Sequence, residues 1–325
     1  MKKFFKIIVS IILVVLTLNC LVGCGGTEHE ESPTPEADTS IFVFSSGNIK
    51  GLTDYGKTLT EIEIPDKIDG KTITTIGEDA FFDNQTVTKI VLPNTITDIG
   101  RGAFYKCTAL NQINLPNSLE NIGEEAFSYC ESLTSITLPE SVKRINDKTF
   151  VYCTKLETIN LERVDYIGDS AFASCDKLKD VTFSENLTFI VGNAFIRCKS
   201  IKNVKIPDSV TEMGSSVFAN SNNIETLILG NGMNYVPKGF FRDGFALKWV
   251  VMDANITTVE EHSFFYCIQI EAVYYLGAES DWNNITFKEN SGGLSGAKRY
   301  YYSELEPAEK GVYWHYENGV PTVWE

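Results

Sequence analysis

The sequence has little of what common catalytic and metal sites require. Histidine occurs 3 times in 325 residues, and His29, His262 and His315 are far apart in the chain. No C-x-x-C pair is present, so we expect no zinc or other metal site. The G-x-S-x-G, H-E-x-x-H and glycine-rich phosphate-binding motifs are also missing. These absences predict a protein that is not an enzyme and uses no cofactor.

Positive charge is scarce as well. The chain has 28 Lys and Arg against 43 Asp and Glu, so the formal net charge is -15, and it is -18 without Lys2, Lys3 and Lys6. Such a surface repels phosphate backbones and anionic bilayers, which argues against nucleic-acid binding, and it helps to keep an exposed protein soluble. With 43% hydrophobic and 22% charged residues, the chain as a whole is expected to fold.

Residues 1–23 are typical of an export signal, because three lysines precede an apolar run from Ile7 to Leu18. The next residues, Leu21-Val22-Gly23-Cys24, resemble the lipobox of bacterial lipoprotein precursors. The resemblance implies that Cys24 is lipidated and becomes the first residue of the mature chain. An ordinary cleaved signal and an uncleaved membrane anchor are the alternatives. We expect an extracytoplasmic lipoprotein that is anchored in a membrane at the surface of a bacterium.

Residues 24–40, which follow the signal, contain almost no apolar side chains and are rich in Glu, Pro, Ser and Thr. A segment of this composition cannot bury a core. We therefore expect a flexible linker that begins at the lipidated cysteine.

One pattern repeats through the rest of the chain. Nine phenylalanines are spaced by 23 residues, with a single gap of 22: Phe81, Phe104, Phe127, Phe150, Phe172, Phe195, Phe218, Phe241 and Phe264. A fixed period of this length indicates a tandem structural unit, in which each copy packs against its neighbours.

Each part of the repeat predicts a local structure. In the clearest copy, Leu133, Ile136 and Leu138 form an L-x-x-I-x-L strand with one buried face, and a proline ends it. An Ile-Gly pair, such as Ile122-Gly123, then makes a tight turn. The segment around each Phe has small or apolar residues at helical spacing, which predicts one short helical turn that points inward.

These residues resemble the BspA-like leucine-rich-repeat family of bacterial surface proteins, over Leu59 to about Tyr302. The resemblance implies an α/β solenoid: a right-handed coil with a parallel β-sheet on one face, short helical turns on the other, and β-rich caps. It also implies attachment to host or matrix proteins or to other bacteria, although the fold alone names no ligand.

The expected organisation divides the chain as follows: signal peptide 1–23, lipidated Cys and linker 24–40, N-terminal cap and irregular first repeat 41–75, solenoid 76–276, C-terminal cap 277–302, and terminal hairpin 303–325. The first hairpin is expected at 41–52, with its turn at 45–48. Asn318-Gly319 between two aromatic-rich runs predicts the last one. The aromatic residues of that hairpin either pack internally or form a platform on which sugars stack.

Six cysteines lie three residues after a repeat Phe: Cys107, Cys130, Cys153, Cys175, Cys198 and Cys267. Asn84, Ser221 and Gly244 occupy the same position in the other copies, so the position accepts small residues. We expect a ladder of buried free thiols, because parallel Cβ vectors give poor disulfide geometry. A disulfide between neighbouring copies is the alternative.

The outward positions of the strands are mostly polar, but the last three strands differ. There, Ile228, Trp249, Val251, Ala272 and Tyr274 form an apolar and aromatic patch. Exposed patches of this kind often mark partner sites. Three interpretations stay open: the C-terminal segment covers the patch, a protein or glycan ligand docks on it, or two copies associate through it.

The sequence therefore predicts a monomeric, non-catalytic surface protein that binds a protein or glycan partner, in adhesion or another cell-surface interaction. The alternative is a structural or scaffolding lipoprotein of the envelope with no external ligand. A solute-binding lipoprotein would need two α/β lobes around a cleft, and the repeat period excludes that arrangement.

Overall fold

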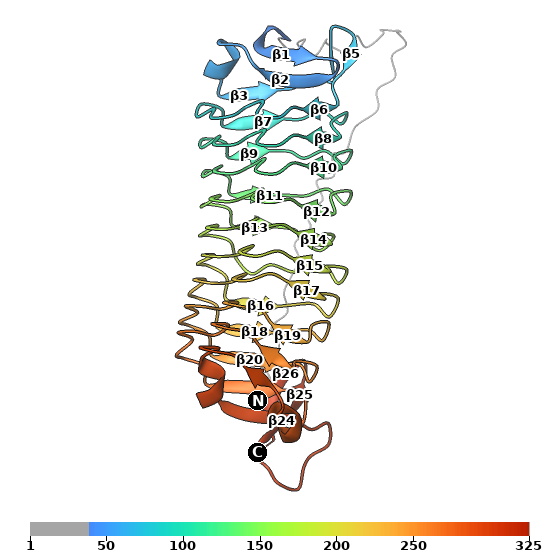
Figure 1. Cartoon of the computed structure of the whole chain (residues 1–325). Coiled ribbons are helices and arrows are strands. Elements are labelled where there is room, and N and C mark those ends of the chain that lie inside the picture. Colours follow the sequence, from blue (N-terminus) through green and yellow to red (C-terminus); the bar gives the residue numbers. More distant parts are fainter. Residues whose placement is uncertain (1–38, 325) are drawn as a thin grey trace, which may run out of the picture. The chain divides into compact units, whose positions relative to one another are not determined.

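The structure is a computed structural model that describes residues 39–324. Residues 37–325 form one compact unit, in which short strands stack in rungs between an N-terminal and a C-terminal cap (Figure 1). A single hydrophobic core runs from Ile41 to Tyr301 through every rung, so this unit contains all that it needs to fold by itself. The signal peptide, Cys24 and residues 25–38 of the linker lie outside the described residues.

The L-x-x-I-x-L segments form parallel strands on one side of the stack, as predicted. We call this set of strands the first ladder. Neighbouring strands pair exactly one repeat apart, for example Ile136 with Ile159 and Leu227 with Val250. Pairing is interrupted between β9 and β11 and between β13 and β16. The strands are β3 (Glu61–Glu63), β7 (Lys89–Val91), β9 (Gln112–Ile113), β11 (Ser135–Ile136), β13 (Thr158–Ile159), β16 (Asn203–Lys205), β18 (Thr226–Ile228), β20 (Trp249–Met252) and β22 (Ala272–Tyr275).

A second ladder of parallel strands precedes the Ile-Gly turns, and the sequence analysis did not predict it. Each of its strands is two residues long, which is too short for an alternating pattern to be recognised. They are β6 (Thr75–Ile76), β8 (Asp98–Ile99), β10 (Asn121–Ile122), β12 (Arg144–Ile145), β14 (Tyr166–Ile167), β15 (Phe189–Ile190), β17 (Glu212–Met213), β19 (Tyr235–Val236), β21 (Thr258–Val259) and β23 (Thr286–Phe287).

The glycines of the Ile-Gly turns are required by close stacking. None of Gly77, Gly100 and Gly123 has a left-handed φ. Instead, a Cβ on Gly123 would lie 2.5 Å from the backbone N of Arg101 and 2.6 Å from the carbonyl carbon of Gly100. The main chains of successive rungs meet too closely here for a side chain.

The third side of each rung contains turns where helical turns were predicted. The residues two before and two after each Phe have positive φ, such as Glu125 (57°) and Tyr129 (60°). With these positive φ values, every second N–H group of the segment points at the next rung. The N–H groups of Glu125, Phe127 and Tyr129 donate to carbonyl oxygens of that rung, 3.0, 2.9 and 2.8 Å away. A helix would use those groups internally. The prediction of helical turns was therefore wrong, and we call this third set of hydrogen bonds the turn ladder.

The side chains of the turn segments do point inward, as predicted. Ala126, Phe127 and Cys130 are fully buried. The nine repeat phenylalanines form a continuous column, in which the centroids of neighbouring rings are 5.0 to 6.2 Å apart. Stacked aromatic rings add to the energy of burial, so this column forms the centre of the core.

The N-terminal cap contains the turn predicted at 45–48 and a second, smaller turn. An antiparallel hairpin turns at Ser46-Gly47, and a smaller one turns at Asp69-Gly70. The first hairpin joins the second ladder, because β2 pairs with β6 in parallel. The elements are η1 (Thr39–Ile41), β1 (Phe42–Ser45), β2 (Asn48–Leu52), η2 (Gly56–Thr58), β4 (Lys67–Ile68) and β5 (Lys71–Thr72).

The C-terminal cap extends the first ladder. Strand β24 pairs with β22 in parallel, β25 with β24, and β26 folds back on β25 through the predicted turn at Asn318-Gly319. The one α-helix found between residues 39 and 324 also lies here. The elements are α1 (Glu279–Trp282), η3 (Gly293–Gly296), β24 (Lys298–Tyr302), β25 (Tyr313–Glu317) and β26 (Val320–Val323).

Candidate binding surfaces

The five patch residues predicted from the sequence lie together on β18, β20 and β22. Ile228, Val251 and Tyr274 occupy the same position on these three strands, and Trp249 lies beside Ala272. The two columns are adjacent on the same side of the first ladder, because alternate residues of a strand share a face. The sequence register thus places all five correctly relative to each other.

Their exposure is unequal. Trp249 is 42% exposed, whereas Val251 and Ala272 are 1% and 6% exposed. Ile228 and Tyr274 are half-buried. Trp249 is therefore the residue through which this patch reaches solvent.

The terminal strands pack against one end of the patch. Tyr274 stacks on Tyr300 of β24 and meets Trp314 of β25 edge to face, with centroids 5.4 and 5.5 Å apart. Trp314 is fully buried, and its Nε1–H donates to the carbonyl oxygen of Tyr275 at 3.0 Å. A buried indole with a satisfied donor is a firm anchor, so the terminal hairpin is held on the sheet.

The hairpin also reaches toward earlier rungs. Burial raises the pKa of Tyr316, and the nearby Tyr302, Asp208 and Asp253 raise it further. Asp208 and Asp253 follow β16 and β20, so carboxylates at the ends of those strands contribute to the raised pKa of Tyr316. This position is set by tertiary packing and could not be read from the sequence.

Two aromatic residues of the terminal strands were missed as surface candidates. Tyr302 and Tyr316 are 36% and 41% exposed, and both contact Trp314. The sequence does not distinguish the exposed aromatic residues of this region from the buried ones. The structure separates the buried anchor Trp314 from these two exposed rings.

A second group of aromatic residues lies on the turn side. Phe82, Tyr105, Tyr129 and Tyr152 pack in series, with ring centroids 5.2, 5.6 and 4.8 Å apart. Two of the three pairs are face-to-face stacks, so much of their ring faces is already covered. Sugar stacking needs free faces, and this group offers mainly edges.

The six repeat cysteines are free and buried, as predicted, and no disulfide joins them. Each thiol donates to the carbonyl oxygen of the Phe in the preceding rung, as Cys153 does to Phe127 at 3.1 Å. Ser221 makes the same bond to Phe195 at 2.9 Å. Burial raises the pKa of Cys107 and Cys267 to about 12, so these groups are not nucleophiles at neutral pH.

No group of three or more His, Cys, Asp or Glu within residues 39–324 could hold a metal ion. No helix in the described part is long and apolar enough to cross a membrane. Cys24 lies outside this range, so its lipidation stays a prediction.

Stacked parallel strands with a 23-residue period define a leucine-rich-repeat solenoid. The family described as "BspA type Leucine rich repeat region" matches residues 53–179 and 165–292. The chain belongs to this family. None of the curated proteins compared with the chain matches it.

Several solved bacterial proteins are similar to the chain. A leucine-rich repeat protein of T. pallidum is 26% identical, with 65% of this chain and 90% of that one covered and a TM-score of 0.47. One from Bacteroides ovatus is 24% identical (85% and 79% covered, TM-score 0.44). A leucine-rich cell surface protein of Faecalibacterium prausnitzii is 21% identical (81% and 100% covered, TM-score 0.36).

Proposed function

We propose that the chain is a lipid-anchored protein of the bacterial cell surface, which binds a protein or glycan partner and catalyses no reaction. Cys24 carries the anchor, and the protein acts as a monomer. The partner docks on the exposed part of the predicted patch, with Trp249 at its centre and the half-buried Ile228 and Tyr274 beside it, while Val251 and Ala272 lie buried beneath. The observation that carries this proposal is the exposure of Trp249 on a mostly polar ladder, since Trp is a favoured anchor at interfaces.

The surroundings of Trp249 fit an interface with an apolar centre and a polar rim. Lys248, the preceding residue, pairs with Glu225 at 3.1 Å. Lys298 on β24 lies over the ring of Tyr300, with its Nζ 4.7 Å from the centroid. Both signs of charge are thus available around the aromatic centre, which suits a partner with several hydrogen-bonding groups.

The test is a binding screen with the compact unit, residues 37–325, against immobilised matrix proteins and a glycan array. For any ligand found, we expect the double variant Trp249→Ala, Tyr274→Ala to bind at least about tenfold more weakly, as for a typical interface anchor. Tyr152→Ala is the matched control, because Tyr152 is 37% exposed on the turn side. A folded double variant with unchanged affinity would disprove the docking surface.

Protease treatment of intact cells separates this function from an envelope scaffold. A surface protein is cleaved, whereas a scaffold inside the envelope is protected until the cells are lysed. Protection together with an empty binding screen would favour the scaffold.

A further inference from the structure

The turn ladder is open at its N-terminal end. In the second rung, the carbonyl groups of Arg101, Ala103 and Tyr105 accept N–H groups of the first rung at 2.9, 2.7 and 2.8 Å. The equivalent carbonyls of the first rung belong to Glu78, Ala80 and Phe82. No described residue donates a hydrogen bond to these three. They point to where the turn of an earlier rung would lie.

The first rung also lacks the cysteine that most later rungs have three residues after the Phe. Cys107 of the second rung donates its thiol proton to the carbonyl of Phe81 at 3.2 Å, but the first rung has Asn84 in this place. Its Oδ1 accepts the N–H groups of Thr86 and Val87, both at 2.9 Å. Its Nδ2 has no partner among residues 39–324, although Asn84 is only 8% exposed. An unpaired buried donor is costly, which marks the place of an absent acceptor.

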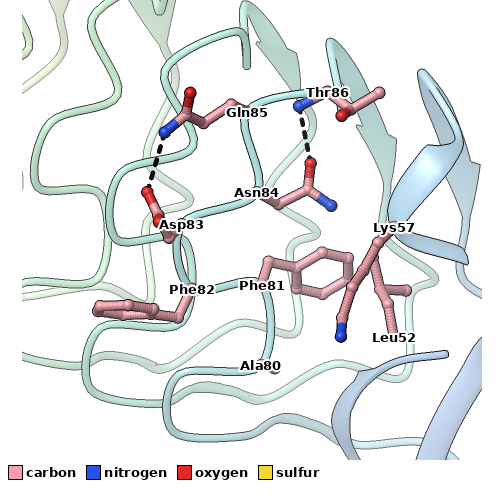
Figure 2. A pocket seen from close by; sticks show the side chains of 9 residues that line it. All are labelled: Leu52, Lys57, Ala80, Phe81, Phe82, Asp83, Asn84, Gln85 and Thr86. Atoms are coloured by element: carbon pink, nitrogen blue, oxygen red, sulfur yellow. Dashed lines mark hydrogen bonds between the residues drawn. The ribbon is translucent and has the colours of Figure 1, made fainter. Parts of the chain in front are cut away.

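These groups surround a cavity of about 320 Å³, lined by Leu52, Lys57 and residues 80–86 (Figure 2). One face of the Phe81 ring stacks on Phe104 at 5.1 Å, and Phe81 also lines the cavity. Figure 2 shows the side-chain amide of Asn84 above this ring, with Lys57 and Leu52 on the opposite wall. The cavity thus combines an apolar wall with the amide donor of Asn84, the ammonium group of Lys57 and the unpaired carbonyls of Ala80 and Phe82, whereas Glu78 lies outside its lining.

The other end of the stack is closed. There, the N–H groups of His262 and Phe264 donate to the carbonyls of Glu289 and Ser291 in the C-terminal cap, at 3.3 and 3.0 Å. Only the N–H group of Tyr266, the third of this series, has no acceptor among residues 39–324, so this rung of a second copy could not offer three donors in series to the cavity. Two N-terminal ends would present carbonyls to carbonyls, so neither arrangement of two copies fits.

We propose that this cavity binds a peptide segment of a partner protein, which adds to the turn ladder as an earlier rung would. Alternate N–H groups of the peptide donate to Glu78, Ala80 and Phe82. One of its carbonyls accepts from Nδ2 of Asn84, and an apolar side chain packs against Phe81. The unpaired carbonyl oxygens need N–H donors in series, which a main chain supplies and an anion drawn to Lys57 does not. This site lies apart from the Trp249 surface and does not depend on it.

The chain itself supplies the probe. In residues 123–130, the N–H groups of Glu125, Phe127 and Tyr129 donate to the next rung. A capped synthetic peptide of this sequence, with Ser in place of Cys130 for solubility, offers the same pattern. The control peptide is N-methylated at these three residues, which removes the donors and keeps the side chains.

Binding is measured by NMR on ¹⁵N-labelled residues 37–325, with up to about 5 mM peptide, a range that detects millimolar affinity. We expect the unmethylated peptide to shift the side-chain amide signals of Asn84 and the backbone amides of residues 80–87. The methylated peptide is expected to leave them unchanged. Absence of these shifts with the first peptide, or equal shifts with both, would overturn the proposal.

The variant Asn84→Asp isolates the donor, because it keeps the oxygen that accepts from Thr86 and Val87. We expect about five- to tenfold weaker binding, as for the loss of one hydrogen bond. Asn186→Asp, at an exposed position, makes the same change in charge and should bind normally. Unchanged affinity of a folded Asn84→Asp protein would also contradict the proposal. If this variant does not fold, the comparison of the two peptides on the unaltered protein still decides whether the proposal holds.

Discussion

Each cysteine of the repeat combines two properties that few side chains share. The thiol fills a small apolar space, and its weak S–H donor satisfies a backbone carbonyl of the preceding rung, as between Cys107 and Phe81. Ser221 makes the same bond, which shows that this position needs a hydrogen-bond donor as well as a small side chain. The residue type therefore follows from packing and bonding within the stack, without any redox role.

Burial of the thiols predicts a loss of stability at alkaline pH. The pKa of Cys107 rises from its ordinary value of 9.0 to about 12 on folding, mainly through desolvation. Because the folded-state pKa is higher, the unfolded chain releases its proton first, and stability falls as pH increases from about 9 to about 12. Each such thiol contributes at most about 1.4 kcal/mol per pH unit to this loss.

The variant Cys107→Ser tests this. At pH 7 we expect it to be less stable than the unaltered unit by about 1 kcal/mol, because Ser keeps the hydrogen bond but is less apolar. Serine does not ionise, so the difference should shrink and then reverse above pH 9. Urea unfolding at several pH values measures it, and a difference independent of pH would contradict the assignment.

The glycines of the Ile-Gly turns make a second prediction at this scale. In Gly123→Ala, the new Cβ would lie 2.5 Å from the backbone N of Arg101, which cannot move aside. We expect a loss of about 1–3 kcal/mol in the free energy of unfolding, as for an overpacked core. Gly296→Ala is the control, since a Cβ there meets no atom within 4 Å, and it should change stability little.

At the scale of elements, the turn segments explain why the stack contains so little helix. Two residues with positive φ, four positions apart, such as Lys148 (54°) and Tyr152 (58°), keep each segment from coiling into a helix. Half of its N–H groups then bond to the next rung, and the other half close turns within the rung. A left-handed conformation costs a non-glycine residue about 1–2 kcal/mol, which the bonds between rungs must offset.

The terminal hairpin gives the prediction for this scale. In Trp314→Ala, the loss of the buried indole and of its bond to Tyr275 should release β25 and β26 from the sheet. Hydrogen exchange should accelerate in residues 298–323 and at the end of β22, and not in the rungs before β16. Val320→Ala, at a position that is 60% exposed, should leave exchange unchanged. If Trp314→Ala protects these residues from exchange as well as the unaltered protein does, other contacts hold the hairpin.

At the scale of the whole molecule, the stack grows by contacts between neighbouring rungs, so its two ends determine what it can bind. The C-terminal end closes the turn ladder and adds the aromatic residues around Trp249. The N-terminal end covers the core but leaves three carbonyls and the amide of Asn84 without partners among the described residues. The two proposed sites therefore lie in different parts of the solenoid.

The membrane anchor is tested on the full chain. In Cys24→Ala, we expect the protein to move from the detergent phase to the aqueous phase in Triton X-114 partition, and to lose incorporation of a labelled fatty acid. Cys20→Ala, in the segment expected to be removed, should behave like the unaltered protein. Retention of Cys24→Ala in the detergent phase would favour an uncleaved membrane anchor.

Much of this protein follows from the sequence because a repeat determines its own register. The Phe period was enough to place the first ladder, the buried thiols and the relative positions of Trp249, Val251 and Tyr274, since neighbouring rungs pair one period apart. Hairpins at Ser46-Gly47 and Asn318-Gly319 also followed, because Gly and Asn adopt positive φ more readily than other residues.

Tertiary structure alone decided the features that depend on contacts between rungs or beyond the repeat. Turns replaced helices because the N–H groups of each segment bond to a neighbour, which no single copy reveals. Of the five residues predicted to form the exposed patch, Trp249 is the exposed one, because Val251 and Ala272 are buried in the assembled sheet. The open cavity beside Asn84 lies where residues 39–324 contain no earlier rung, and only the stacked structure shows which of the described groups are then left unpaired.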